Sequence, residues 1–578
     1  MATTQGMQPL ARAVHAAALG LIITGGGLTA AVSQAAEHST QQRRAYQVPA
    51  GNLSSALSNF ASQAGITLPI EPGLVEGLRS PGLNAATSVQ DGLQQLLQGT
   101  GLQASPQGNG LYLLTPQVAA GTGLELGATS ITGQGLAATT ENSGSYTTGA
   151  MQTATKLPLS LRETPQSVTV ITRQRMDDQG MRSLDDVVQA TPGLRLSASR
   201  PANSEFFARG FPINNLMFDG LPTTYNADWV ATADLAPYDR VEVVRGATGM
   251  MQGAGNPSAA INMVRKRPTK EFQASISGSA GSWDNYRSEL DVSGPVNASG
   301  TVRGRFVGAY NDKDSYQDYA GRERGVFYGV SEFDLSDSTT LTVGASEQND
   351  NNNINWGGLP VNPNGSHMGF SRSKTFGYSW SHQDIDNKTL FVELDQRFDN
   401  DWRLHLGASK NWSEFKMMGA VLERNNDASY RQRVFNQGRD FDQSSYDFFA
   451  SGPFTLLGRQ HELIVGGNWN KDDFDYHGGR DATYRYIVDM NNLAAFDPPK
   501  PTALNVNQWQ YNRTQEQKGV YVASRFSLTD STTFILGSRL SWYSHDSLDD
   551  TNGVREPTDH KHFSKSGEVT PYAGLVQD

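Results

Sequence analysis

The chain has 578 residues, a formal net charge of −11 and no cysteine. The length is sufficient for several domains, and the acidic balance argues against nucleic acid as a partner. The lack of cysteine excludes disulfides and thiolate metal sites. The mean hydropathy of −0.48 still permits a transmembrane β-barrel, because lipid-facing and lumen-facing residues alternate in such a barrel.

Residues 1–36 have the pattern of a secretory signal peptide. Arg12 precedes the apolar run Ala17–Ala31, and Ser33-Gln34-Ala35 provides the small residues of a cleavage site. A membrane anchor is the alternative, but the run is short and Gly25-Gly26-Gly27 interrupts it. We therefore expect cleavage after Ala35 or Ala36.

Residues 44–116 carry two helical patterns that repeat at an offset of 36 residues. Ser88 and Asp91 form a capping-box-like start, and Gly65 and Gly99 lie where helices commonly end. Short strand candidates flank each helix, and two βαβ-like units predict a small α+β domain. The apolar helix positions are Leu53, Leu57, Phe60 and Ala61 in the first and Val89, Leu93, Leu96 and Leu97 in the second; the strand candidates are Tyr46–Val48, Ile66–Leu68, Leu102–Ala104 and Leu111–Leu114.

Residues 117–160 are rich in Gly, Thr, Ser and Ala, which is typical of a mobile linker. Within them Leu126–Thr132 is a short β-prone segment. A free strand of this kind can add to the edge of another protein's sheet through main-chain hydrogen bonds. A plain linker without a binding role is the alternative.

Residues 161–270 contain several short motifs in a fixed order. The apolar runs Val241–Val244 and Ala260–Val264 enclose a Gly-rich segment, which on its own would fit an ordinary bulged hairpin. Val168–Ile171 is predicted as a buried strand and Ser183–Gln189 as a short helix. The other motifs are Glu163–Val168, Leu184–Val187 with Thr191-Pro192-Gly193, Ala208–Phe211 and Phe218–Gly220.

From residue 271 onward apolar residues alternate with charged ones at a period of two. Leu390, Val392 and Leu394 share one strand face, and Glu393 and Asp395 share the other. Such alternation, in about 13 strand candidates, predicts a transmembrane antiparallel β-barrel. The expected tight turns are Ser336–Ser338, Asn400-Asp401, Leu457–Arg459 and Thr529–Ser531, and the expected long loops are 347–373, 413–441 and 471–515.

The motifs of residues 161–270 closely resemble the plug domain of TonB-dependent outer-membrane receptors. The resemblance is to ferric-siderophore receptors of the ferric-pyoverdine type, which carry an N-terminal signalling domain. It implies a mainly β fold with a signal peptide at 1–36, a signalling domain at 44–116 (a secretin and TonB short N-terminal domain), a linker at 117–160, an α+β plug at 161–270 and a barrel at 271–578. Since the family's barrel has about 22 strands, we expect the chain to be truncated at its C-terminus and the barrel to be incomplete.

The resemblance also assigns site residues. It identifies the TonB box with Ala128, Thr129, Ser130, Ile131 and Thr132. It assigns siderophore binding to Arg209, Tyr225 and Trp229 of the plug and to Trp356 and Trp380 of the barrel. The remaining plug arginines are expected to form structural salt bridges with the polar lumen, together with Asp239 and Glu242; they are Arg240, Arg245, Arg265 and Arg267.

The implied function is import of a ferric-siderophore, pyoverdine-like or hydroxamate, across the outer membrane of a Gram-negative bacterium. The implied partners are TonB with ExbB and ExbD, an inner-membrane anti-sigma regulator and outer-membrane lipid. The regulator receives the occupancy signal from the periplasmic N-terminal domain. No catalytic group, metal site or directly bound cofactor is expected, because iron arrives inside the siderophore; His560 and His562 are expected in a solvated loop. The alternatives are another ligand (ferrioxamine, ferrichrome, cobalamin or haem) and a passive porin-like channel. Haem is disfavoured, because no histidine lies between His38 and His367.

Overall fold

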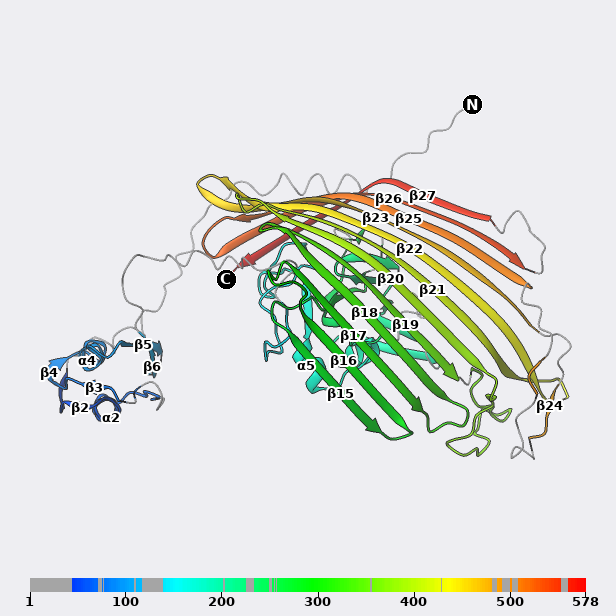
Figure 1. The fold of residues 1–578 in the computed structure, drawn as a ribbon, viewed down its shortest axis with the longest axis horizontal. Coiled ribbons are helices and arrows are strands. Elements are labelled where there is room, and N and C mark those ends of the chain that lie inside the picture. Colours follow the sequence, from blue (N-terminus) through cyan, green and yellow to red (C-terminus); the bar gives the residue numbers. More distant parts are fainter. Residues whose placement is uncertain are drawn as a thin grey trace, which may run out of the picture. The chain divides into compact units, whose positions relative to one another are not determined.

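The computed structural model forms two compact units, residues 1–131 and 132–578, and each is treated by itself (Figure 1). It describes residues 44–577 except 71–74, 76, 109–110, 117–138, 201–202, 225–232, 249–251, 254, 256, 354–355, 428, 481–485, 491–498, 502–507 and 552–559. Among the described residues, none of the helices combines the length and the hydropathy that a membrane-spanning helix needs.

The first unit is the small α+β domain that the sequence predicts. Asn52 accepts a hydrogen bond from Ser54 N at the start of the first helix, and Gly65 ends that helix at φ 70°. Ser88 and Asp91 cap the second helix as expected. The strands pair as β1 with β4, β2 with β3 and β5 with β6. The elements are β1 (Arg44–Val48), β2 (Gly51–Asn52), α2 (Leu53–Ala64), β3 (Arg79–Ser80), β4 (Leu83–Thr87), α4 (Val89–Leu96), β5 (Leu102–Gly108) and β6 (Leu111–Pro116).

Both helices bury their predicted apolar faces in one core. Leu53, Leu57 and Phe60 of α2 meet Leu93 and Leu96 of α4, all at 0–1% exposure. The helices approach so closely that a methyl group on Gly92 would lie 2.6 Å from the Phe60 ring. The expected strand at 66–68 is wrong, since this segment forms only an isolated bridge at Thr67, whose carbonyl accepts from Tyr112 N at 2.9 Å.

In the second unit, the plug is built on a five-stranded sheet of order β12-β11-β14-β13-β7. The predicted strand 168–171 and the two apolar runs 241–244 and 260–264 all form strands within it, and the predicted helix starts with a capping box of Ser183 and Asp186. A second, three-stranded sheet has the order β10-β9-β8. The elements are β7 (Ser167–Thr172), α5 (Arg173–Asp178), α6 (Leu184–Ala190), β8 (Leu194–Arg200), β9 (Asn203–Ala208), β10 (Phe211–Pro212), β11 (Asn215–Phe218), β12 (Leu221–Thr224), β13 (Tyr238–Arg245) and β14 (Ala259–Arg265).

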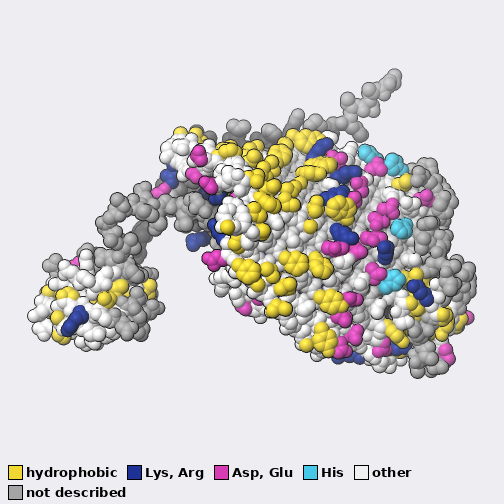
Figure 2. Space-filling model, viewed as in Figure 1, with side chains coloured by type: hydrophobic (Ala, Val, Ile, Leu, Met, Phe, Trp, Pro, Cys, Tyr) yellow, Lys and Arg dark blue, Asp and Glu magenta, His cyan; other side chains and the backbone are white. Residues whose placement is uncertain are grey.

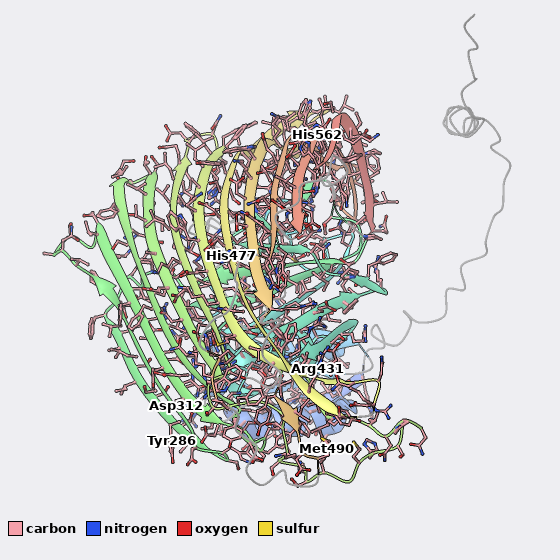
Figure 3. All side chains as sticks on the ribbon, turned by 90° about the vertical axis from the view of Figure 1, so that its right-hand side faces the viewer. Tyr286, Asp312, Arg431, His477, Met490 and His562 are labelled. Atoms are coloured by element: carbon pink, nitrogen blue, oxygen red, sulfur yellow. The ribbon has the colours of Figure 1, made fainter. Side chains whose placement is uncertain are left out.

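The rest of the unit is one antiparallel sheet of 13 described strands that curves around the plug (Figures 1 and 3). Neighbours follow chain order from β15 to β27, and β24 adds to β22. The strands are β15 (Gln273–Gly281), β16 (Asn285–Pro295), β17 (Val302–Asp314), β18 (Gly321–Ser336), β19 (Thr339–Asn353), β20 (His382–Arg397), β21 (Arg403–Arg424), β22 (Tyr430–Leu456), β23 (Arg459–Arg480), β24 (Ile487–Val488), β25 (Trp509–Ser527), β26 (Thr532–Thr551) and β27 (His560–Gln577).

The two faces of this sheet differ as the period of two predicts. Leu390 is 53% exposed and Val392 is 40% exposed. Glu393, on the opposite face of the same strand, points toward the plug and is 2% exposed. We call the face with exposed apolar side chains the outward face and the face toward the plug the inward face. Figure 2 shows an apolar zone on the outward face that gives way to charged side chains and histidines. This arrangement fits lipid on one side and a polar lumen on the other.

The tight turns lie where the sequence predicts them, but two of the three expected long loops are shorter than predicted. The third, expected at 347–373, corresponds to the connection 354–381 between β19 and β20. β21 runs to Arg424 and β22 begins at Tyr430, so most of 413–441 is strand rather than loop. At these strand ends the outward side chains, such as Glu414 and Lys416, are polar, and buried apolar side chains such as Phe415 face inward. This is the reverse of the alternation in the lipid-facing part of the sheet. The same error affects 471–515, where β23 continues to Arg480 and β25 begins at Trp509. His560 and His562 also belong to a strand, β27, and not to a loop.

Asp185 links α6 to β9 through a partly buried hydrogen bond. Ser204 Oγ donates to Asp185 Oδ2 at 2.8 Å, while Oδ1 has no hydrogen-bond partner among the described residues. Burial raises the pKa of the Asp185 carboxyl to about 6, and the Ser204 hydrogen bond only partly opposes this shift. The folded plug therefore holds a charged carboxylate there at a cost when the pH is neutral.

Gly92→Ala is expected to destabilise the first unit. The added methyl group must displace the buried Phe60 ring, and such overpacking costs about 1–3 kcal/mol. This exceeds the gain of about 0.5–1 kcal/mol from replacing a helical glycine. Hydrogen exchange of α2 and α4 measures the outcome. Gln95→Ala, on the exposed side of α4, is the control and should leave exchange unchanged or slower; equal protection in both variants would contradict the packing.

Asp185→Asn is expected to stabilise the plug at neutral pH. The folded pKa of about 6 lies above the unfolded value of about 3.9. The folded state therefore retains a proton that the unfolded state has released, and stability falls as the pH rises through this window. Removing the charge should add on the order of 1 kcal/mol above pH 6 and nothing below pH 4. Urea unfolding at pH 4 and pH 7.5 tests this; an equal effect at both values would refute it.

Candidate functional site

The predicted ligand residues fall into separate parts of the described chain. Arg209 occupies the turn between β9 and β10 at φ 55°, and its guanidinium covers Gly246, where a methyl group would lie 2.6 Å from Nη1. Arg209 thus contacts the plug's own backbone. Tyr225, Trp229 and the TonB box at 128–132 lie outside the described residues. Their roles, and ligand contact by Arg209, stay predictions.

Trp356 packs into an aromatic cluster on the inward face near the long loops. Its ring lies 4.6 Å from that of Phe435, beside buried Phe415 and Phe441. Trp380 belongs to a neighbouring cluster, where it stacks on Tyr378 with centroids 4.6 Å apart and an interplanar angle of 2°. Both tryptophans are half-buried. The structure therefore supports an inward location for Trp356. Trp380 packs with Ala420 and Val434, which share the outward strand face with Tyr446.

Two arginines that were not predicted from the sequence belong to the Trp356 cluster. The Arg439 guanidinium lies 4.7 Å from the Phe415 ring and 5.0 Å from the Tyr476 ring. Arg513 lies 5.2 Å from the Phe474 ring. We call these five residues and Trp356 the upper lumen cluster. Their strand parity, opposite to that of the exposed apolar residues, was the available signal, but it lies in segments that we expected to be loops.

The upper lumen cluster combines flat apolar surfaces with delocalised cations. Guanidinium groups stack on ring faces and pair with oxyanions, so such a cluster suits a planar ligand that carries negative charge. Asp472 accepts from Arg513 Nη2 at 2.8 Å and from Thr224 of the plug at 3.0 Å. The cluster is therefore tied to the plug through a hydrogen-bonded acid.

Ion pairs connect the plug to the inward face of the sheet. Arg267 reaches Glu393 at 2.7 Å, as predicted for a plug arginine. Arg240 and Arg265, however, pair inside the plug, with Glu242 and Asp219 at 2.7 Å each. Further plug–sheet pairs, not predicted, are Lys156–Asp447, Lys266–Asp291 and Asp234–Arg287, at 3.1, 2.9 and 2.8 Å.

Asp219 shows how a buried charge is stabilised by protein groups. Burial alone would raise the pKa of its carboxyl, but the Arg267 and Arg265 guanidiniums outweigh burial and hold the pKa below the ordinary value. Asp219 also accepts from Arg265 N at 2.9 Å. The carboxylate therefore stays ionised inside the plug.

Residues 139–160, expected in the mobile linker, are packed against the plug and the sheet. The Asp239 carboxylate accepts from Thr140 N, Glu141 N and Thr139 Oγ1, each at 2.9 Å. The Glu141 carboxylate pairs with both terminal nitrogens of Arg305 on β17, at 2.6 and 2.7 Å. Composition alone could not reveal this, because hydrogen bonds fix residues 139–141 and only scattered apolar side chains, such as Met151 and Leu157, are buried further along.

Comparisons with known proteins identify three regions. Residues 160–260 match the TonB-dependent receptor plug domain, residues 346–577 the TonB-dependent receptor-like β-barrel, and residues 68–125 the secretin and TonB N-terminus short domain. The chain is 39% identical to the ferripyoverdine receptor of Pseudomonas aeruginosa over 92% of this chain and 65% of that protein. It is 38% identical to the ferric-pyoverdine 358 receptor of Pseudomonas putida over 96% of this chain and 68% of that protein.

Solved structures agree with these matches. The ferripyoverdine receptor of the outer membrane of P. aeruginosa, bound to ferripyoverdine, superposes with a TM-score of 0.70 at 35% identity, over 93% of this chain and 68% of that chain. The alcaligin outer-membrane receptor of Bordetella pertussis gives 0.59 at 32% identity, over 77% of this chain and 65% of that chain. The chain spans 65–71% of the length of the four curated pyoverdine receptors it matches. It belongs to the family of TonB-dependent receptors of the outer membrane.

Proposed function

We propose that the protein imports a ferric-siderophore of the pyoverdine class across the outer membrane. The observation that carries this proposal is the identity of 38–39% to ferric-pyoverdine receptors over more than nine-tenths of the chain. The upper lumen cluster supports it independently. A pyoverdine-type ligand carries a planar aromatic group and anionic oxygens, which match ring faces and guanidiniums. Haem, cobalamin or another siderophore has no comparable support.

The siderophore docks between the plug and the long-loop end of the sheet. Trp356 and Arg439 provide a stacking face and a cation there, and Trp380 is a further predicted contact from the segment that leads into β20. Arg209, Tyr225 and Trp229 contribute from the plug. The siderophore already fills the coordination sphere of the iron, so the receptor binds the organic shell and supplies no metal ligand or bound cofactor.

Energy for release comes from TonB, which pairs with Ala128–Thr132 by strand addition. ExbB and ExbD couple TonB to the proton gradient of the inner membrane. A pull at the TonB box reaches Thr139–Glu141 before any other described contact of the plug. Loss of the Asp239 hydrogen bonds and of the Glu141–Arg305 pair then frees the segment that continues to Lys156.

Residues 44–116 report occupancy to an inner-membrane anti-sigma regulator. Their match to the secretin and TonB short domain supports this role. The unit carries its own core of Leu53, Phe60 and Leu96, so it can act as a separate module in the periplasm. A purely structural adaptor would leave transcription unchanged when ligand binds.

Trp356→Ala is expected to weaken binding of ferripyoverdine about 3- to 10-fold, which corresponds to the loss of one aromatic contact. Quenching of the remaining tryptophan fluorescence on titration measures the affinity. Trp412→Ala is the matched control, since Trp412 is 43% exposed on the outward face and should leave the affinity unchanged. Equal effects of both variants would show that the upper lumen cluster is not part of the ligand site.

Deletion of Ala128–Thr132 is expected to abolish uptake of iron-loaded siderophore and to leave its binding to cells intact. Binding needs only the plug and the sheet, whereas uptake needs the pull of TonB. Cells that carry the deletion are compared with cells of the parent receptor, each with and without a protonophore. Uptake that persists after the deletion, or that the protonophore does not inhibit in the parent, would favour a passive channel instead.

A further inference from the structure

We propose that Asp546, His560 and His562 form a binding site for a divalent transition-metal ion such as Zn²⁺ on the outward face of the sheet. The site is distinct from the upper lumen cluster, which lies on the inward face. It does not depend on the proposed siderophore import.

The strand register brings the three side chains together. β26 pairs with β27 so that Asp546 lies directly opposite His562, and Leu548 opposite His560. Side chains two residues apart share a face of a strand, so His560 and His562 both flank Asp546. They are on the same face as Leu536, which is 50% exposed. Figure 3 labels His562 on this hairpin, and Figure 2 shows histidines among acidic side chains on the sheet surface.

Both imidazole rings already contact the Asp546 carboxylate. His560 Nε2 lies 3.1 Å from Asp546 Oδ2, and His562 Nδ1 lies 3.3 Å from the same oxygen. The three side chains are 52–59% exposed, so an ion can enter and the rings can turn to the metal–nitrogen distance of about 2.0–2.1 Å. Two imidazoles and one carboxylate form a three-ligand set that leaves a fourth position for water.

The ligand chemistry selects the class of ion. Imidazole nitrogen suits Zn²⁺, Ni²⁺ and Cu²⁺, whereas Ca²⁺ and Mg²⁺ prefer oxygen ligands. A second group of possible ligands on the described strands, Asp440, Asp475 and His477, has donor atoms within 4.8 Å of one another but only one histidine. It therefore serves as the internal comparison for the proposed site.

The position gives the ion a structural consequence. Trp542 precedes Asp546 by four residues on the same strand face, and aromatic residues of this kind mark the edge of the lipid zone of a barrel. His560 is the first residue of β27 after the connection 552–559. An ion bound here joins β26 to β27 at the base of that connection. Because it binds only the paired strands, it stabilises the hairpin.

Isothermal titration of the intact chain in detergent micelles with Zn²⁺ tests the site. The parent is expected to bind one Zn²⁺ per chain, and the double variant His560→Gln/His562→Gln is expected to bind none. Asp546→Asn should weaken binding by more than about 10-fold. His545→Gln is the matched control. His545 precedes Asp546 on β26, and its Nδ1 lies 3.1 Å from Gln515 Nε2. The control should bind like the parent.

Thermal unfolding provides a second readout. Zn²⁺ should raise the melting temperature of the parent and of His545→Gln, and should leave that of the double variant unchanged, while Ca²⁺ should have no effect. Absence of Zn²⁺ binding in the parent would overturn the proposal. So would unchanged binding in the double variant, or loss of binding in His477→Gln alone, which would assign the ion to the other group.

Discussion

The polar inward face of the sheet is the constraint on which the rest of the structure depends. A plug inside such a face cannot be held by apolar packing, so it is held by charges. Arg267 meets Glu393, and Lys156 meets Asp447, with three of these four side chains at 8% exposure or less. A buried pair adds little net stability compared with apolar contacts, but removing one partner costs about 3–5 kcal/mol. Such pairs therefore fix the orientation of the plug more than they stabilise it.

The plug is attached unevenly along the chain, and this has a mechanical consequence. Residues 139–157 contact the plug through Asp239 and the sheet through Arg305 and Asp447. They come before the central strands β13 and β14, whose side chains are almost all buried. A load applied at residue 138 thus acts first on hydrogen bonds and ion pairs that water can replace. The apolar core around Val241 and Ile261 lies further along the chain.

Sequence reasoning succeeded wherever an apolar pattern dictates the structure. The faces of α2 and α4, the buried runs of β13 and β14, and the alternation of Leu390 and Val392 all appeared as predicted. It failed where polar contacts decide. Residues 139–157 have a linker composition, and Arg439 lies in a segment whose outward side chains are polar. Hydrogen bonds between residues far apart in sequence leave no periodic pattern in the sequence, so these parts of the site could not be predicted from it.

The upper lumen cluster lies on strands that are longer than a bilayer requires. β22 has 27 residues, which corresponds to about 90 Å of extended chain, whereas about 9–11 tilted residues cross a bilayer. On its outward face the apolar side chains Phe448 and Tyr446 give way to Ser444, Asp442 and Asp440. Residues 430–445 therefore extend beyond the lipid. This extension is still hydrogen-bonded to β21 and β23, so its inward side chains, Arg439 among them, project from a paired backbone. A ligand site built on paired strands rather than on free loops keeps its shape before the ligand arrives, which lowers the entropy cost of binding.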